Sequence, residues 1–262
     1  MISVCDFQKK KTAGEKIAMV TCYDYTSAAI LNKTGIDCLL VGDSLAMTMH
    51  GFRDTISATV EMMAMHTAAV ARGAKDKFII SDLPFLSYRS SLSKNMAAVR
   101  ALMQAGAHAV KLEGASGNAE FIAHLVHSGV PVMGHLGLTP QFVHQLGGYK
   151  VQGKTEEAAR RILEEALVLE KAGCFALVLE CVPAAVAEKI SKKLKIPAIG
   201  IGAGAATDGQ VLVFQDLLGL NTDFKPKFVK RFLDGAALLT QAVEDYARAV
   251  KTEEFPAHEH SF

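Results

Sequence analysis

The sequence predicts an α/β protein that folds as a single-domain (β/α)8 barrel. Eight short apolar runs recur along the 262 residues, and amphipathic helical segments lie between most of them. The length also matches the roughly 250 residues of many such barrels. A doubly wound parallel sheet is the alternative, because it uses the same alternation of strands and helices.

The predicted strands are almost continuously apolar, which is typical of parallel strands buried on both faces. Strands that alternate with helices form right-handed units and a parallel sheet. Eight such units favour a closed barrel over an open sheet. In chain order the runs begin at Ile17, Cys38, Lys77, Ala109, Pro131, Ala176, Pro197 and Gln210.

Segment 155–172 has the clearest helical pattern. Apolar residues form one stripe, glutamates lie in the first turn and Lys171 lies in the last, which suits the helix dipole. Gly173 should end this helix in the left-handed conformation. The same ending is expected of segments 62–72 and 96–105, which are followed by Gly73 and Gly106.

Composition limits the classes of function. The net charge of +1, from 28 basic and 27 acidic residues, gives no case for binding nucleic acid or an anionic membrane. No apolar stretch reaches the ~18 residues that a membrane span needs. Five cysteines without a CxxC pair indicate reduced thiols and a cytoplasmic protein. We expect one barrel domain over 1–262, with a short N-terminal extension and a polar C-terminal tail, "KTEEFPAHEHSF".

Polar residues gather where the predicted strands end. In a barrel the carboxyl ends of the strands share one face, and that face carries the active site. Each residue also has an ordinary structural explanation, such as a helix cap, a turn, an ion pair between Lys111 and Glu113, or a core histidine at His135. Their coincidence on one rim favours a site. The residues are Asp24, Asp43, Ser44, Asp82, Lys111, Glu113, His135 and Glu180.

Three of these residues predict a metal site. Asp43, Asp82 and Glu113 supply hard oxygen ligands without cysteine, which favours Mg²⁺ over zinc. In "AVKLEG", Lys111 and Glu113 should project to the same face, because residues two apart in a strand do so. We therefore expect Glu113 to face a cation and Lys111 to face a substrate anion.

Two loops carry weaker signals. "GIGAG", 200–204, follows the seventh predicted strand, where many barrels bind phosphate, although a tight turn explains the glycines equally well. The loop containing "GLTPQF" and "GGYKVQGK" follows the fifth strand. Its length and its glycines indicate a functional loop that acts as a lid.

Motifs along nearly the whole chain resemble the ketopantoate hydroxymethyltransferase family. The pair "GHLGLTPQ" and "GGYKVQG" is specific, whereas "GIGAG" alone is not. The stretch "GASGNAEF" and the last few dozen residues match only loosely. The other matching motifs are "TCYDY", "LLVGDSLAMT", "HTAAVARGA", "SDLPF", "VKLEG", "LVLECVP" and "DGQVLV".

The resemblance implies a (β/α)8 barrel that uses Mg²⁺ and condenses 3-methyl-2-oxobutanoate with 5,10-methylenetetrahydrofolate to give ketopantoate in pantothenate biosynthesis. It implies Asp43 and Asp82 as metal ligands, with Glu113 bound directly or through water. Ser44, Lys111 and His135, together with the two aspartates, would contact the keto acid. Glu180 would be the general base. Homo-oligomers, commonly decamers, are also implied.

Two rival functions remain open at this stage. A Mg²⁺-dependent 2-oxo-acid lyase of the phosphoenolpyruvate mutase/isocitrate lyase type would use a similar substrate enolate without folate. A non-catalytic scaffold barrel is the other rival, although every acidic residue that the chemistry needs is present. Folate dependence separates the first rival from the transferase, and a metal titration addresses the second.

Overall fold

The computed structural model describes residues 1–222 and 226–262. Its eight strands are all parallel and close into a barrel in the order β1 to β8, with β8 pairing β1. This confirms the predicted (β/α)8 fold and excludes the open doubly wound sheet. The strands are β1 Ile17–Thr21, β2 Cys38–Val41, β3 Phe78–Asp82, β4 Ala109–Glu113, β5 Val132–Gly137, β6 Ala176–Glu180, β7 Ala198–Ile201 and β8 Gly209–Leu212.

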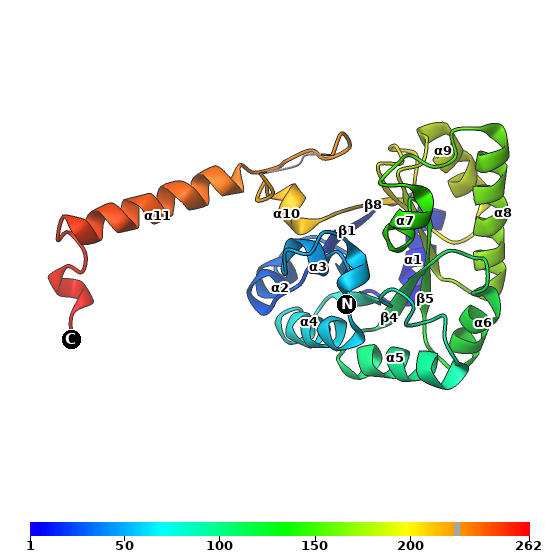
Figure 1. Ribbon diagram of the computed structural model, residues 1–262, viewed down its shortest axis with the longest axis horizontal. Coiled ribbons are helices and arrows are strands. Elements are labelled where there is room, and N and C mark those ends of the chain that lie inside the picture. The colour runs from blue at the N-terminus through cyan, green and yellow to red at the C-terminus, as the bar shows by residue number, and fades with distance from the viewer. Residues whose placement is uncertain (223–225) are drawn as a thin grey trace. The chain divides into compact units, whose positions relative to one another are not determined.

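Helices surround the strands of the barrel (Figure 1). The longer ones among the described residues up to 212 are α1 Val4–Ala13, α2 Tyr25–Asn32, α4 Val60–Gly73, α5 Leu92–Gln104, α6 Ala119–His127, α8 Glu156–Ala172 and α9 Ala184–Lys193. The short ones are α3 Leu45–Thr48, η1 Thr55–Ser57, η2 Pro140–Phe142 and α7 Val143–Leu146.

Helix α8 has the ends that its sequence predicts. The Thr155 side chain accepts a hydrogen bond from the Ala158 backbone, and Gly173 follows with φ +101°. Helix α5 ends similarly, because Gly106 has φ +109°. The prediction for Gly73 was wrong: it is the last residue of α4, and Ala74 follows with φ −121°. A Cβ at Gly73 would collide with Tyr25 and Ala28, so close packing against α2 explains this glycine.

Helix α1 belongs to the amino-terminal side of the barrel. Phe7 is fully buried and makes edge-to-face contacts with Phe78 at the start of β3 and with Phe175 just before β6. Lys11 pairs with Asp208, directly before β8, at 2.7 Å. The predicted N-terminal extension is therefore an integral helix of the barrel unit.

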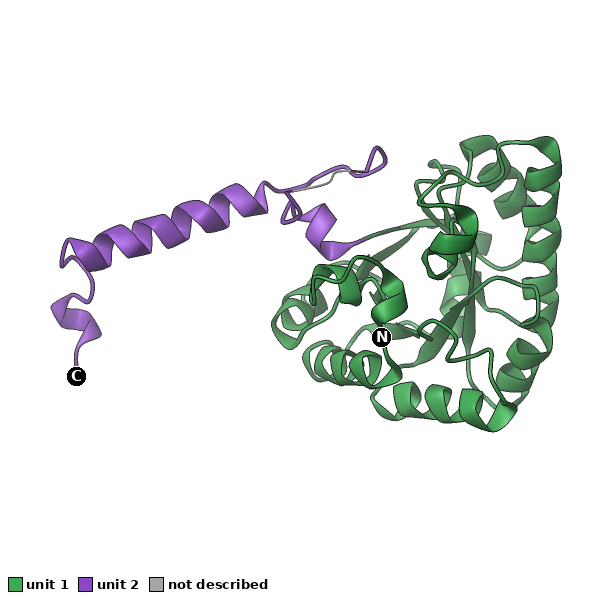
Figure 2. Ribbon diagram, in the orientation of Figure 1, with its two compact units in different colours: residues 1–212 green, residues 213–262 purple. Residues whose placement is uncertain are grey.

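The chain divides into two compact units, 1–212 and 213–262 (Figure 2). The described part of the second unit contains α10 Phe214–Leu217, α11 Gly235–Lys251 and η3 His258–His260. The sequence analysis did not predict α11. Large apolar side chains of α11 are exposed, among them Leu239, Val243 and Tyr246. No helix within the described residues is long and apolar enough to cross a membrane.

All five cysteines are free. Cys22, Cys38 and Cys174 are buried, and burial raises the pKa of Cys22 and of Cys174 to about 12. Cys5 is exposed and Cys181 is half-buried, so only three of the five are core residues. The buried thiols are protonated at neutral pH and are therefore poor nucleophiles.

Candidate active site

The strand register brings the predicted polar residues together at the carboxyl ends of neighbouring strands. Asp82 lies opposite Lys111 across β3 and β4, and Glu113 lies opposite His135 across β4 and β5. All four side chains are buried. Glu180, the last residue of β6, is partly open to solvent. The site is therefore built from residues that are far apart in sequence.

Lys111 pairs with Asp82. Its Nζ lies 2.9 Å from Asp82 Oδ1, and both side chains are about 95% buried. Asp82 Oδ2 accepts a hydrogen bond from the Asp43 backbone N–H at 3.1 Å. The ion pair that sequence reasoning weighed for Lys111 is thus formed with Asp82 across the sheet, and Glu113 contacts His135 instead.

His135 lies between two carboxylates. Its Nδ1 is 3.3 Å from Glu113 Oε1, and its Nε2 is 3.2 Å from Glu180 Oε2. Burial and the Lys111 charge lower the pKa of His135, but the contacts with Glu113 and Glu180 outweigh them and raise it to about 9. The imidazole is therefore protonated at neutral pH. Its Nδ1–H donates to Glu113, because the Lys111 ammonium 3.4 Å away is itself a donor.

Asp43 completes the buried acidic group. Burial raises the pKa of Asp43 well above its usual value, and the neighbouring charges of Asp82 and Glu113 raise it further. The cluster holds four carboxylates, from Asp43, Asp82, Glu113 and Glu180, against the cations Lys111 and His135. This excess of negative charge in a buried site is stabilised by an added cation.

The chemistry of this donor set fits a hard divalent cation. Asp43, Asp82 and Glu113 offer carboxylate oxygen atoms, of which Asp82 Oδ1 already lies 2.9 Å from the Lys111 ammonium. As they stand, however, no three His, Cys, Asp or Glu side chains in 1–222 and 226–262 are arranged to enclose a metal ion. The metal site therefore stays a prediction.

Ser44 and Asp24 have different surroundings. The Ser44 hydroxyl lies 2.8 Å from the Tyr23 hydroxyl and does not cap α3. Asp24 caps α2, because its carboxylate accepts hydrogen bonds from the backbone N–H and the hydroxyl of Ser27. Ser44 lies next to the candidate site because it directly follows Asp43 in the chain. Asp24 has the structural role of a helix cap.

Sequence reasoning missed two residues of the site, Gln141 and Tyr88. Gln141 is buried in η2, and its side-chain amide donates to Asp43 Oδ2 at 2.8 Å. The Tyr88 hydroxyl donates to Gln141 Oε1 at 2.7 Å. The loop sequence "GLTPQ" was the only sign of Gln141 in the sequence. It predicted a lid, but it did not indicate that Gln141 contacts Asp43.

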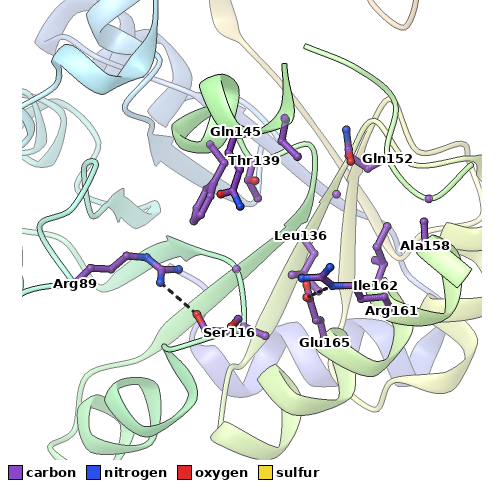
Figure 3. Close-up of a pocket in the computed structure, with 16 residues that line it drawn as sticks. Arg89, Ser116, Leu136, Thr139, Gln145, Gln152, Ala158, Arg161, Ile162 and Glu165 are labelled. Atoms are coloured by element: carbon purple, nitrogen blue, oxygen red, sulfur yellow. Dashed lines mark hydrogen bonds and ion pairs between the residues drawn. The ribbon is translucent and has the colours of Figure 1, made fainter. Parts of the chain in front are cut away.

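A cavity of about 480 Å³ is lined by residues next to the site in sequence, and Figure 3 shows its lining side chains. Two glycines contribute to its wall. Gly114 directly follows β4, which ends at Glu113, and Gly137 is the last residue of β5, which carries His135. Arg89 lies over the Phe142 ring at 5.2 Å, and polar side chains such as Gln152 and Arg161 complete the lining. The cavity is therefore a separate space that adjoins the buried acidic cluster.

The fold and this cluster define a (β/α)8-barrel enzyme with acid–base groups on the carboxyl-terminal rim. The chain belongs to the ketopantoate hydroxymethyltransferase family, whose model matches residues 1–258. It is 58% identical to the 3-methyl-2-oxobutanoate hydroxymethyltransferase of Francisella tularensis subsp. tularensis (strain WY96-3418), covering 100% of this chain and 99% of that one. The same figure holds for the Bdellovibrio bacteriovorus enzyme of that name, with full coverage of both chains.

Solved structures with little sequence identity share the fold. Phosphonopyruvate hydrolase, in a complex with oxalate and Mg²⁺, superposes with a TM-score of 0.63 at 10% identity, covering 99% of this chain and 93% of that one. The 2,3-dimethylmalate lyase of the phosphoenolpyruvate mutase/isocitrate lyase superfamily gives 0.58 at 14% identity, covering 98% and 89%. At this low identity the likenesses show the fold alone.

Proposed function

We propose that this enzyme transfers a hydroxymethyl group from 5,10-methylenetetrahydrofolate to 3-methyl-2-oxobutanoate, which gives ketopantoate. The observation that carries the proposal is the buried cluster in which His135 bridges Glu113 and Glu180 beside the Asp82–Lys111 pair. It combines a base, an anion-binding cation and spare carboxylates within one site, which is what forming and trapping an enolate requires.

The proposed metal is Mg²⁺, held by Asp43 and Asp82 and by Glu113 directly or through water. When bound, Mg²⁺ supplies Lewis-acid stabilisation of the charge that develops on the ketone oxygen of the keto acid. The Asp43 backbone N–H donates to Asp82 Oδ2, which connects the residues that follow β2 to the end of β3.

The protein's own residues hold the substrate and move its proton. Lys111 binds the carboxylate of the keto acid, and Ser44 and His135 orient the molecule. Glu180 takes the proton from carbon 3, because it is the carboxylate of the cluster that has no assigned metal. Its side chain is 18% exposed, so it stands at the open end of the site.

Carbon 3 of the substrate then attacks the methylene group that the folate carries. A new carbon–carbon bond forms, and both bonds from the methylene carbon to N5 and N10 of the folate break. Water supplies the hydroxyl group of the product, and the two nitrogens take up the proton from carbon 3 and the remaining proton of water, which leaves tetrahydrofolate. The adjoining cavity supports a bulky second substrate, because its volume far exceeds the needs of a five-carbon acid.

The test is a reconstitution with purified components. Protein, 3-methyl-2-oxobutanoate, methylenetetrahydrofolate and Mg²⁺ should yield ketopantoate, which mass spectrometry detects. Omitting the folate should abolish the product, and chelating the metal should do the same. Condensation of the keto acid with an added aldehyde or acid in the absence of folate would instead support the lyase alternative.

The oligomeric state and the cellular location of the protein can also be proposed from the resemblance to the family. We propose a homodecamer in the cytoplasm, supported by the exposed apolar side chains of α11 and by the free cysteines. Sedimentation at several protein concentrations tests the assembly.

A further inference from the structure

Gln141 connects two of the three carboxylates that are proposed to bind Mg²⁺. Its side-chain Nε2 donates to Asp43 Oδ2 at 2.8 Å and to the Leu83 carbonyl at 2.9 Å. Its backbone N–H donates to Glu113 Oε2 at 3.1 Å. One residue from the loop after β5 thus contacts acidic groups that come from β4 and from the end of β2.

Tyr88 supplies the donor that matches the oxygen of the Gln141 amide. Its buried hydroxyl donates to Gln141 Oε1 at 2.7 Å. A flipped amide would present its oxygen to the Asp43 carboxylate and its NH₂ group to the tyrosine, which would place two acceptors together. The Asp43 carboxylate and the Leu83 carbonyl, which only accept, set this orientation, and the phenol reinforces it by donating to the amide oxygen.

We propose that Tyr88 and Gln141 form a positioning pair that fixes the carboxylates of Asp43 and Glu113 for cation binding. Partners of this kind orient metal ligands and change metal affinity without touching the ion. The inference rests on the proposed function, because it needs the proposed carboxylate metal site. It adds Tyr88 and Gln141 to the site, two loop residues to which the proposed chemistry assigns no role.

The pair is more than a packing element, because each polar atom of the Gln141 side chain is used. Both amide protons and the amide oxygen have partners within 3 Å. Gln141 is also 3% exposed, so water does not substitute for these contacts. A change that keeps the volume but removes the amide should therefore release Asp43 while leaving the loop packed.

The experiment titrates metal-free, purified protein with Mn²⁺, followed by electron paramagnetic resonance of the free ion. Mn²⁺ replaces Mg²⁺ at oxygen sites. The variants are Gln141→Met, Tyr88→Phe and the double variant, with Gln145→Met as the matched control. Gln145 lies in α7 on the same loop, is exposed and lines the adjoining cavity instead of the acidic cluster.

Gln141→Met should weaken Mn²⁺ binding about 10–100-fold, as loss of such a partner commonly does. Tyr88→Phe should weaken it less, and should add little in the Gln141→Met background, because the tyrosine acts mainly through the amide. Its other contact, from the Glu113 backbone N–H to the hydroxyl, is long at 3.4 Å. Gln145→Met should bind Mn²⁺ like the wild type. Circular dichroism confirms that each variant is folded.

Unchanged Mn²⁺ affinity in folded Gln141→Met or Tyr88→Phe protein would overturn the proposal. A loss from Tyr88→Phe that is as large in the Gln141→Met background as in the wild type would overturn the dependence of Tyr88 on Gln141. A wild-type protein that binds no Mn²⁺ would overturn the metal site itself, and this inference with it. The wild-type titration thus separates a failure of the proposed function from a failure of the pair.

Discussion

Glu180 Oε2 lies 3.2 Å from Nε2 of the buried His135, whose other nitrogen contacts Glu113. The imidazolium thereby holds the carboxylate that we assign as the base and ties it to the proposed metal site. The backbone strengthens the connection, because the Leu138 N–H donates to the Glu180 carbonyl at 2.8 Å. Base, imidazolium and acidic cluster therefore act as one unit.

Asp82→Asn should weaken Mg²⁺ binding and keto-acid binding together. The change removes one charge but keeps the size of the side chain and the acceptor for the Asp43 N–H. Calorimetric titration of metal-free protein measures Mg²⁺, and a second titration with keto acid in the presence of Mg²⁺ measures the substrate.

Asp24→Ala is the matched control for that experiment. It removes a helix cap, which costs about 0.5–2 kcal/mol of stability, but it lies outside the acidic cluster. It should lower the melting temperature with both affinities unchanged. Normal affinities in folded Asp82→Asn protein would show that the metal assignment is wrong.

Lys111→Met should raise the KM for 3-methyl-2-oxobutanoate, because the substrate carboxylate loses its cationic partner. Stability should fall as well, since the change leaves Asp82 buried without its ion-pair partner. Kinetics below the melting transition separate the two effects.

Lys11→Met provides the comparison, because it also removes the lysine of an ion pair, in this case a half-buried pair with Asp208 at the opposite end of the barrel. It should lower stability and leave the KM unchanged. A Lys111→Met enzyme with reduced stability but a normal KM would assign Lys111 a purely structural role.

Gly137→Ala should destabilise the fold more than Gly129→Ala. Both glycines have positive φ, +93° and +85°, so both substitutions carry similar backbone strain. A Cβ at Gly137 would collide with the Glu180 carbonyl and with Val182, whereas a Cβ at Gly129 meets no atom within 4 Å. Thermal unfolding should show an extra loss of about 1–3 kcal/mol at Gly137, the range for overpacking. Equal losses of stability in the two variants would show that the close contact at Gly137 does not affect the free energy of unfolding.

The stability of the fold should decrease as the pH falls, and His108 is the cause. Partial burial lowers the pKa of His108, and its Nδ1 accepts a hydrogen bond from the Ile79 N–H. The unfolded chain then binds more protons than the folded one below about pH 6.5, so stability rises with pH through this window and falls as the solution becomes acidic.

His108→Gln should flatten this dependence. Melting temperatures between pH 5 and 8 test it, because the difference between wild type and variant should depend on pH. Parallel curves for the two proteins would exclude His108 as the source.

The strands and the rim residues were predictable because local sequence determines them. Each buried strand is an apolar run, and its polar ending at Asp82, Glu113 or Glu180 marks the open end of the barrel. The partners were not predictable in the same way. Lys111 has a carboxylate two residues away in its own strand, yet it pairs across the sheet with Asp82, which depends on strand register.

Other features escaped for similar reasons. Gln141 meets Asp43 98 positions away, and a single sequence gives no sign of such a pairing. The end of α4 at Gly73 depends on packing against α2, and not on a left-handed cap. Helix α11 was not predicted, although apolar residues recur along its sequence.

The most direct test of the account measures proton removal at carbon 3 without folate. Wild-type protein with Mg²⁺, in deuterated water, should exchange the carbon-3 hydrogen of 3-methyl-2-oxobutanoate, as followed by proton NMR. Glu180→Gln keeps the size and the contact with His135 but removes the base, so exchange should slow by about 10²–10⁴-fold while Mg²⁺ binding is retained. Equal exchange by both proteins, well above the protein-free rate, would contradict the assignment of Glu180 as the base.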